Sequence, residues 1–266
     1  MIAPQLTTFE ENGVTSCADL GRPYGVTLAF TQRMGGVSRP PYSSLNLGLN
    51  CADDPSCVEE NRRRALKSLG LSCYQDYLLA PHQVHGDYIE VIKDRSPQSI
   101  EAAKKRIAKG CDGIVVCTKG VPVMLCFADC VPVILVAPGG FAVVHSGWRG
   151  TFAKIAQKAA IALMDETGCT PNDVLCYIGP HIQGEDYEVS GELLDKFKAE
   201  FGSIVQVGRS NLRLSAAILS CLGDVGIAPE HIYVSSISTP QNTARFYSYR
   251  AEEGLCGRHG AIACLS

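Results

Sequence analysis

The sequence predicts an α/β (α+β) fold, with a mixed, largely buried β-sheet core flanked by helices in a single compact domain over residues 1–266. Three observations lead to this prediction. Four short apolar runs lie between residues 113 and 144, and near-continuous apolarity is typical of strands buried on both faces. Segments with helix start and stop signals lie on either side of these runs. The length of 266 residues, 46% of them hydrophobic, is sufficient for one large core.

The N-terminal part is expected to contain strands and turns and then two helices. A strand over 26–31 precedes a glycine-rich turn at 34–38. A helix is expected to begin near Asp54, since Asp54 suits the N-cap, Pro55 the first turn and Gly70 the end. Its charged middle, residues 59–64, is expected to be mostly a solvated face. A second helix is expected over about 99–109, ended by a glycine.

In the centre, strands are predicted over the runs 113–117, 121–127, 131–136 and 141–144, and proline at the second position of two runs suits strand starts. A helix from Thr151 to about Thr167 follows, because its apolar residues share one stripe and Gly168 suits its end. Residues 145–150 would then form a strand-to-helix turn. The remaining predictions are helices near 191–201 and 214–225 and strands near 174–178 and 232–234.

Charge and composition exclude several classes of protein. Lysine and arginine total 24 and aspartate and glutamate 27, so the net charge of −3 argues against a nucleic-acid partner. No apolar run approaches the roughly 18–20 residues that span a bilayer, so no membrane association is expected. The N-terminal residues do not resemble a secretory signal. The thirteen cysteines are scattered, and several (Cys117, Cys126, Cys176 and Cys221) lie in apolar runs. We therefore expect buried thiols in a reducing cytoplasm.

Three places carry residues suited to chemistry: the segment 81–86 with its two histidines, Cys130, and His145. Each is expected at a strand end, where a side chain can enter a cleft. Two imidazoles and one thiolate form a three-ligand set suited to zinc, with a fourth position open for catalysis. The alternative is that the histidines are hydrogen-bonded and the cysteine only packs. Spacing along the chain does not decide between the two.

Polar turns suggest where a substrate binds. After His145, Gly147 and Gly150 permit close backbone approach, and Arg149 adds a positive charge, as in an anion site at a helix start. The alternative is a tight turn whose Trp148 fills the core. Two other polar turns place Arg33 and Asn46 where each could face a polar substrate or belong to an ordinary loop.

Together these residues resemble the laccase-domain family, known both as multicopper polyphenol oxidase and as purine nucleoside phosphorylase. The resemblance rests on stretches in family order from about Phe30 to Arg258, among them PHQVHGD, CDGIVV, ADCVPV, HSGWRGT and RFYSYR. It implies one Zn²⁺ per chain bound by His85, Cys130 and His145. It also implies phosphorolysis of adenosine, inosine and methylthioadenosine with inorganic phosphate, and adenosine deamination. Copper is not expected, because a multicopper centre needs more histidines than the six present.

Under this hypothesis the partner is a small purine nucleoside, phosphate lies near Arg149 or Arg33, and Asp129 orients a ligand. Residues 211–215 and 237–239 depart from the family pattern, which affects the expected details of the substrate pocket and any subunit contact of the tail, but not the three ligands. Two alternatives stay open. Cys130 can be the nucleophile of a Cys–His hydrolase or of an amidase acting on a cell-wall precursor. The chain can also be a non-catalytic zinc-binding module with a fourth ligand such as His82. The sequence does not determine the oligomeric state.

Overall fold

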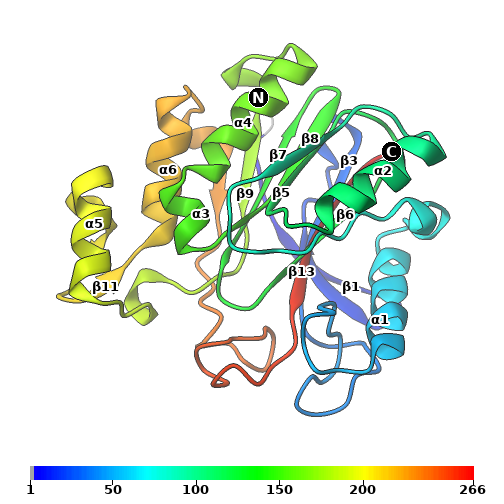
Figure 1. The fold of residues 1–266 in the computed structure, drawn as a ribbon, viewed down its shortest axis with the longest axis horizontal. Coiled ribbons are helices and arrows are strands. Elements are labelled where there is room, and N and C mark those ends of the chain that lie inside the picture. The colour runs from blue at the N-terminus through cyan, green and yellow to red at the C-terminus, as the bar shows by residue number, and fades with distance from the viewer. Residues whose placement is uncertain (1–2) are drawn as a thin grey trace.

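Two β-sheets pack face to face at the centre of the structure, a computed structural model that describes residues 3–266 (Figure 1). The first sheet has five strands in the order β1-β2-β3-β13-β6, and every neighbouring pair is antiparallel. Its strands are β1 (Thr7–Glu11), β2 (Val14–Ala18), β3 (Val26–Thr31), β6 (Val123–Phe127) and β13 (His259–Leu265).

The second sheet has six strands in the order β12-β9-β7-β8-β5-β4. Its two outer pairs are parallel and the inner pairs are antiparallel. Its strands are β4 (Ile89–Ile92), β5 (Gly113–Val116), β7 (Val131–Ala137), β8 (Gly140–Ser146), β9 (Leu175–Ile178) and β12 (Ile232–Val234). A separate two-stranded ribbon joins β10 (Gln206–Val207) and β11 (Asn211–Leu212).

Helices cover the outer faces of both sheets, so the molecule has four layers (Figure 1). α1 packs on the five-stranded sheet, whereas α4, α5 and α6 share a core with the six-stranded sheet. α2 lies beside β4 and contributes to the core between the sheets. The helices are α1 (Pro55–Ser68), α2 (Pro97–Ile107), α3 (Trp148–Phe152), α4 (Ile155–Thr167), α5 (Gly191–Phe201) and α6 (Leu214–Asp224). Short 3-10 helices lie at Pro23–Gly25, Ser72–Tyr77, Pro171–Asp173, Gly184–Asp186, Ser203–Val205 and Pro229–His231.

The side chains of β7 alternate between two cores. Val133 and Leu135 face the helical layer, and Ile134 and Val136 face the five-stranded sheet. The pleat places successive side chains on opposite faces, so a strand covered on both faces is apolar throughout. The predicted mixed, largely buried sheet core with flanking helices is therefore confirmed. The assignment of residues 1–266 to one domain stays a prediction.

The prediction of one helix over 151–167 was wrong. The chain forms the short helix α3, which begins at Trp148, and then the longer α4. Between them Lys154 adopts a left-handed conformation with φ 60°, which interrupts the right-handed helix. The end at Gly168 was predicted correctly, since this glycine caps α4 with φ 69°.

Smaller differences concern element ends and strands not predicted individually. The helix expected over 99–109 is α2, which begins earlier because Ser96 is its N-cap. The strand expected from 121 begins at Val123, since Pro122 cannot donate a hydrogen bond to the sheet. Strands β1, β2, β4 and β13 were not identified singly. β13 is rich in small residues, which gave little periodic signal.

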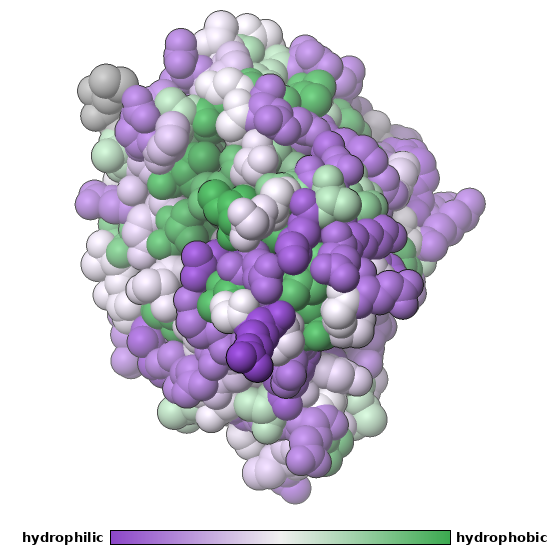
Figure 2. Space-filling view, turned by 90° about the vertical axis from the view of Figure 1, so that its left-hand side faces the viewer, coloured by the Kyte–Doolittle hydropathy of each residue, from purple (hydrophilic) through white to green (hydrophobic). Residues whose placement is uncertain are grey.

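The side of the molecule that carries α5 and α6 is shown in Figure 2, where hydrophobic residues gather above the centre and hydrophilic residues surround them. Within residues 3–266, no helix combines the length and apolarity needed to cross a bilayer.

Candidate metal centre and pocket

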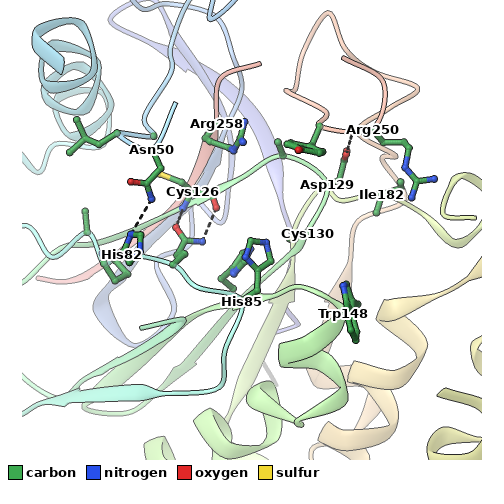
Figure 3. Close-up of a pocket in the computed structure, with 18 of the residues that line it drawn as sticks. Asn50, His82, His85, Cys126, Asp129, Cys130, Trp148, Ile182, Arg250 and Arg258 are labelled. Atoms are coloured by element: carbon green, nitrogen blue, oxygen red, sulfur yellow. Dashed lines mark hydrogen bonds between the residues drawn. The ribbon is translucent and has the colours of Figure 1, made fainter. Parts of the chain in front are cut away.

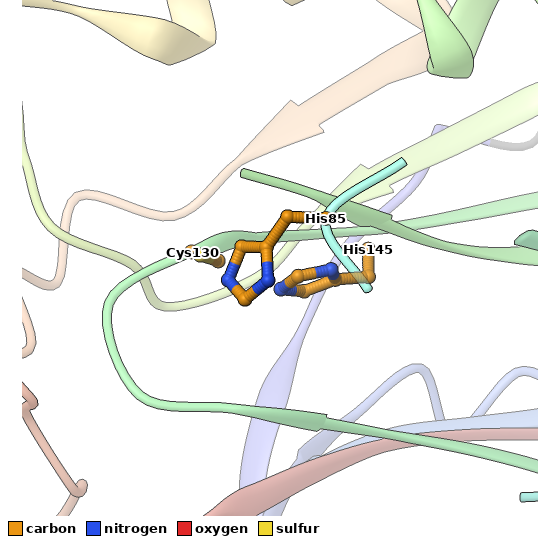
Figure 4. A group of neighbouring side chains, drawn as sticks. All are labelled: His85, Cys130 and His145. Carbon is orange, nitrogen blue, oxygen red and sulfur yellow. The ribbon is translucent and has the colours of Figure 1, made fainter. Parts of the chain in front are cut away.

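His85, Cys130 and His145 come together in space, although they are far apart along the chain (Figure 4). One ligand atom from each residue lies within 4.8 Å of the others. A tetrahedral zinc with bonds of about 2.0–2.3 Å separates its ligand atoms by about 3.3–3.8 Å. Small rotations of the side chains close this difference, so the donor set and its spacing suit one zinc ion.

The antiparallel pair β7–β8 brings two of the three residues together. His145 lies on β8 opposite Pro132 of β7, and Cys130 directly precedes β7. His85 does not lie at a strand end as expected. It belongs to the irregular segment before β4 and has φ 59°, a conformation that turns this segment sharply.

Asp112 holds the two histidine segments in place. One carboxylate oxygen accepts two hydrogen bonds, one from Nδ1 of His145 at 2.8 Å and one from the backbone N–H of His85 at 3.0 Å. The second oxygen accepts from the N–H groups of Val84 and Gly86. Nδ1 of His145 carries the proton of this hydrogen bond to Asp112. Nε2 is therefore the ring nitrogen left to bind a metal.

Two glycines let the ligand segments approach one another. A Cβ on Gly147 would lie 3.0 Å from His85 and 3.1 Å from the sulfur of Cys130. A Cβ on Gly150 would lie 2.9 Å from the carbonyl oxygen of Gly86. The expectation of close backbone approach after His145 therefore holds. Gly147 thus lies against two of the candidate ligand residues, and Gly150 against the residue that follows His85.

The ionisation of the cluster favours a metal-binding thiolate. Burial raises the pKa of the Cys130 thiol, but His145 and His85 outweigh it, so the net shift is downward. Burial lowers the pKa of His145, whereas Cys130 and Asp112 raise it, and the net shift is upward. Burial likewise opposes ionisation of Asp112, but its bond to His145 keeps its pKa low. The thiolate is the form of cysteine that binds metals.

The cluster lies in a pocket of about 860 Å³ (Figure 3). Figure 3 shows His85 and Cys130 in the middle, with Arg258 and His82 on one side and Trp148 on the other. We name these the arginine side and the tryptophan side. The pocket is large enough for a ligand the size of a nucleoside. Its lining comprises Gly48, Leu49, Asn50, Arg62, Ala80, Pro81, His82, Gln83, His85, Ala108, Cys126, Ala128, Asp129, Cys130, His145, Trp148, Ile182, Tyr187, Tyr249, Arg250 and Arg258.

A family model described as multi-copper polyphenol oxidoreductase laccase matches residues 27–266, which is most of the chain. The chain belongs to this laccase family. The resemblance expected from the sequence motifs is confirmed.

Curated relatives of this chain are named as purine nucleoside phosphorylases and not as laccases. A "Purine nucleoside phosphorylase" of Deinococcus radiodurans is 35% identical over 242 residues, which cover 89% of this chain and 88% of the relative. "Purine nucleoside phosphorylase YlmD" of Bacillus subtilis is 32% identical, with 88% and 86% covered. "Purine nucleoside phosphorylase YfiH" of Escherichia coli is 31% identical, with 87% and 91% covered.

Solved structures of similar proteins have the same fold. The crystal structure of YlmD from Geobacillus stearothermophilus has a TM-score of 0.84 and 30% identity, and covers 98% of this chain and 99% of its own. A Bacillus licheniformis protein, whose structure is titled "hypothetical protein YfiH", has a TM-score of 0.85 and 27% identity, with 97% and 98% covered.

In this laccase-family chain, Arg33 is held by the protein itself. Its guanidinium donates to the carbonyl oxygens of Ser43 and Thr243, pairs with Glu252 at 3.0 Å and lies over the ring of Tyr247. Arg33 is not in the pocket lining. The geometry therefore gives no support to its expected role in substrate binding.

Asn46 is fully buried and also lies outside the pocket lining. Its side-chain oxygen accepts from the N–H groups of Gly48 and Arg258, and its amide donates to Asp53. Instead of facing a substrate, Asn46 supports the backbone on which the pocket residue Arg258 sits.

Arg149 is exposed on α3 and stacks over the adjacent Trp148, with 4.3 Å between the guanidinium carbon and the ring centroid. Trp148 lines the pocket, whereas Arg149 does not. The anion site expected after His145 receives no support here, because the charge of Arg149 lies outside the pocket.

Asp129 does not act on a ligand as expected. It accepts from the hydroxyl of Thr239 at 2.6 Å and from the backbone N–H of Arg250 at 2.7 Å. It thereby fixes two C-terminal loops at the tryptophan side.

His82 lines the pocket, and its Nδ1 lies 3.3 Å from the amide of Asn50. Among residues 3–266, the group that could hold a metal ion contains three side chains, and His82 is not one of them.

Sequence reasoning missed Asp112 and the pocket arginines Arg62, Arg250 and Arg258. Asp112 directly precedes a buried strand in the motif CDGIVV. An acidic residue next to a buried strand was the signal that could have identified it as part of the site. Arg62 belongs to a charged run expected to face solvent. Its neighbour Arg63 does so, whereas Arg62 turns towards the pocket.

Proposed function

We propose that the protein is a zinc-dependent purine nucleoside phosphorylase, which converts adenosine, inosine or methylthioadenosine to free base and ribose 1-phosphate. The bond between the purine nitrogen and the ribose carbon breaks, and phosphate oxygen forms the new bond to that carbon. The departing base takes up a proton. The observation that carries the proposal is the three-ligand cluster in a nucleoside-sized pocket. The names of relatives that align along most of the chain support it.

In this proposal His85, Cys130 and His145 hold one zinc ion per chain. When bound, zinc supplies a Lewis acid with an open position for an oxygen ligand. Asp112 fixes the ring of His145, and its hydrogen bonds to the backbone of residues 84–86 fix the segment that carries His85. The protein thereby orients its ligands before substrate arrives. Copper has no part in the proposal.

The tryptophan side of the pocket suits the purine. Trp148, Ile182 and Tyr187 provide apolar surface there, and aromatic rings stack on bases. Burial raises the pKa of Tyr187 to about 12, so its phenol stays neutral and can donate a hydrogen bond. Arg250 lies over the ring of Tyr187 and donates to the carbonyl oxygen of Glu188, which holds this wall together.

Adenosine deamination is proposed as a second activity of the same pocket, with water in place of phosphate. We place the protein in the cytoplasm, where the proposed nucleoside substrates and inorganic phosphate occur and where its free thiols remain reduced.

A Cys–His hydrolase or amidase, for example on a cell-wall precursor, is the second candidate function. The observation that favours it is the lowered pKa of Cys130 between two imidazoles, since a thiolate is also a nucleophile. The third reading, a non-catalytic zinc module, is less well supported because structural zinc usually has four protein ligands.

The decisive experiment incubates purified protein with a nucleoside panel, with and without phosphate, and detects free base and sugar phosphate. We expect phosphate-dependent cleavage, about one zinc per chain by elemental analysis, and loss of both in Cys130→Ala with the fold retained. Full activity in metal-free protein would remove the zinc mechanism. Stoichiometric alkylation of Cys130, with hydrolysis that survives chelation, would establish the hydrolase instead.

A further inference from the structure

We propose that Arg62 and Arg258 form an anion subsite on the arginine side of the pocket, and that this subsite binds the phosphate oxyanion. The inference rests on the proposed phosphorylase function, for which it assigns the place of the second substrate. It replaces the expectation that phosphate lies near Arg149 or Arg33.

The two arginines reach the same part of the pocket from distant parts of the chain. Arg62 comes from α1, and Arg258 directly precedes β13. Arg62 and the thiol of Cys126, which also lines the pocket, both donate to the carbonyl oxygen of Leu47, and the stem of Arg258 packs against the next residue, Gly48. Figure 3 shows Arg258 and Cys126 on the other side of His85 and Cys130 from Trp148. A ligand that spans the pocket would therefore have its base at one side and its anion at the other.

Neither Arg62 nor Arg258 forms an ion pair with a carboxylate within residues 3–266. Other arginines of the chain do so, for example Arg33 with Glu252 and Arg106 with Glu90. Arg62 and Arg258 are both half-buried. Two partly desolvated positive charges close to one another are unfavourable unless an anion lies between them.

The neighbouring groups do not supply this anion. Burial raises the pKa of the Cys126 thiol, so it stays neutral near pH 7. Burial also raises the pKa of Cys51, although Arg258 opposes the shift. The carboxylate of Asp53 accepts hydrogen bonds from Ser38, Asn46 and the N–H of Asp54. An external anion is therefore the partner that these two guanidinium groups require.

Both arginines are held in position by backbone carbonyl groups. Nε of Arg62 donates to Leu47 at 2.9 Å, and Nη1 of Arg258 donates to Cys256 and Gly257 at 2.8 Å each. A Cβ on Gly48 would lie 2.7 Å from Cγ of Arg258, so glycine at this position lets the arginine stem lie against the loop.

These bonds leave donors free for a ligand. Both terminal nitrogens of Arg62, and Nε and Nη2 of Arg258, have no hydrogen bond to oxygen in the described chain. Two preorganised guanidinium groups match the several oxygens of phosphate, which arginine binds in a bidentate way. Free phosphate and the phosphate group of a nucleotide share this chemistry.

The test measures steady-state phosphorolysis and, separately, the binding of inorganic phosphate without nucleoside by calorimetry. Arg62→Gln and Arg258→Gln should each raise the KM for phosphate and the phosphate dissociation constant about 10–100-fold. The KM for nucleoside should change less than threefold. Arg63→Gln is the matched control, because Arg63 is the next residue of the same helix but pairs with Glu60 outside the pocket. It should leave both phosphate constants at the wild-type value.

Lysine variants distinguish a loss of phosphate binding from a folding defect. Arg62→Lys and Arg258→Lys keep the charge but lose the bidentate fork, so phosphate constants between those of wild type and the glutamine variants are expected. Thermal melting identifies any variant that does not fold. AMP in the calorimeter distinguishes the source of the anion: if the glutamine variants weakened AMP binding but left the binding of inorganic phosphate at the wild-type value, the subsite would belong to a nucleotide and the proposal would be overturned.

The outcomes separate the subsite from the function. If wild-type protein binds phosphate but cleaves no nucleoside, the phosphorylase proposal fails, and the calorimetry still measures the subsite. If wild type is a phosphorylase but both glutamine variants keep the phosphate constants of Arg63→Gln, the subsite alone is overturned. The same holds if Arg149→Gln raises the KM for phosphate and the pocket variants do not.

Discussion

At the scale of single residues, Asp112 ties together two of the three segments of the candidate metal centre. Its carboxylate binds the ring of one ligand residue and the backbone around another, and its carbonyl oxygen accepts from the N–H of His145 at 2.7 Å. Successive N–H groups that point at one carboxylate form an anion-binding turn, and the positive φ of His85 makes this turn possible.

Asp112→Asn should weaken zinc binding about 10–100-fold, because the amide cannot accept from all of these donors. Competition with a chromophoric chelator measures the zinc dissociation constant. Asp19→Asn is the control, since Asp19 is also buried and accepts from Tyr177 and Gly21, away from the cluster. Equal zinc affinity of the two variants would show that Asp112 does not position the ligands.

His259 should make the fold sensitive to acid. It is buried between Phe127 and Phe246, and burial together with Arg258 and Arg33 lowers its pKa to about 3. Below the unfolded-state pKa of about 6.5, the unfolded chain binds a proton that the folded chain does not. The contribution to stability is therefore complete above pH 6.5. It falls by about 1.4 kcal/mol per pH unit as the pH drops towards 3.

His259→Phe removes this titration. Relative to wild type, the variant should gain about 2 kcal/mol in free energy of unfolding between pH 7 and pH 5. Urea denaturation at several pH values measures the difference. If the two proteins lost stability in parallel, His259 would not titrate in this way.

At the scale of elements, the end of α4 depends on a glycine in the left-handed conformation. Gly168 has φ 69°, and a Cβ there would meet no atom within 4 Å. Gly168→Ala should therefore cost about 1 kcal/mol from backbone strain alone. Gly191 has equally open surroundings but lies in the first turn of α5 without a positive φ. Gly191→Ala should be neutral or stabilising by about 0.5 kcal/mol. Urea midpoints measure both, and equal effects would contradict the argument.

The sequence predicted elements well where the end signals were local. Asp54 caps α1 as expected, and its side chain accepts from the N–H of Ser56. The break between α3 and α4 was missed because a lysine, not a glycine or proline, takes up the left-handed conformation. Tertiary contacts hold it there: Lys154 pairs with Glu200 and lies near the ring of Phe201. No local pattern in the sequence records such contacts.

At the scale of the whole molecule, the cluster connects three segments, two of them paired as β7 and β8 and the third held by Asp112. Removal of zinc should therefore lower the melting temperature without unfolding the protein, since the two large cores do not depend on the metal. At a zinc concentration 100 times its dissociation constant, the loss is about 2.7 kcal/mol, or roughly 5–10 °C for a chain of this size.

Melting with and without a chelator measures this shift. Cys130→Ala should show no shift on chelation, because it lacks one of the three ligands. An identical shift in wild type and this variant would place the bound zinc elsewhere.

The mixed sheet core could be predicted because burial on both faces leaves a direct signal in β7 and β8. The ligand set was predicted from family motifs and not from spacing, since Cys130 and His145 meet through sheet pairing and His85 joins them through the hydrogen bonds of Asp112. The arginine side could not be predicted. A charged run such as residues 59–64 does not show which of its arginines faces the pocket, and Arg258 depends on Asn46, far away in the chain.

Strand β13 lies between β3 and β6, although it is made after both. During synthesis, residues 258–265 leave the ribosome after all the other strands. Until then the growing chain has two open sheet edges, and open edges invite pairing with other chains. The place of Arg258 is also undefined at that stage. The same late event therefore closes the gap between β3 and β6 and places Arg258 in the pocket.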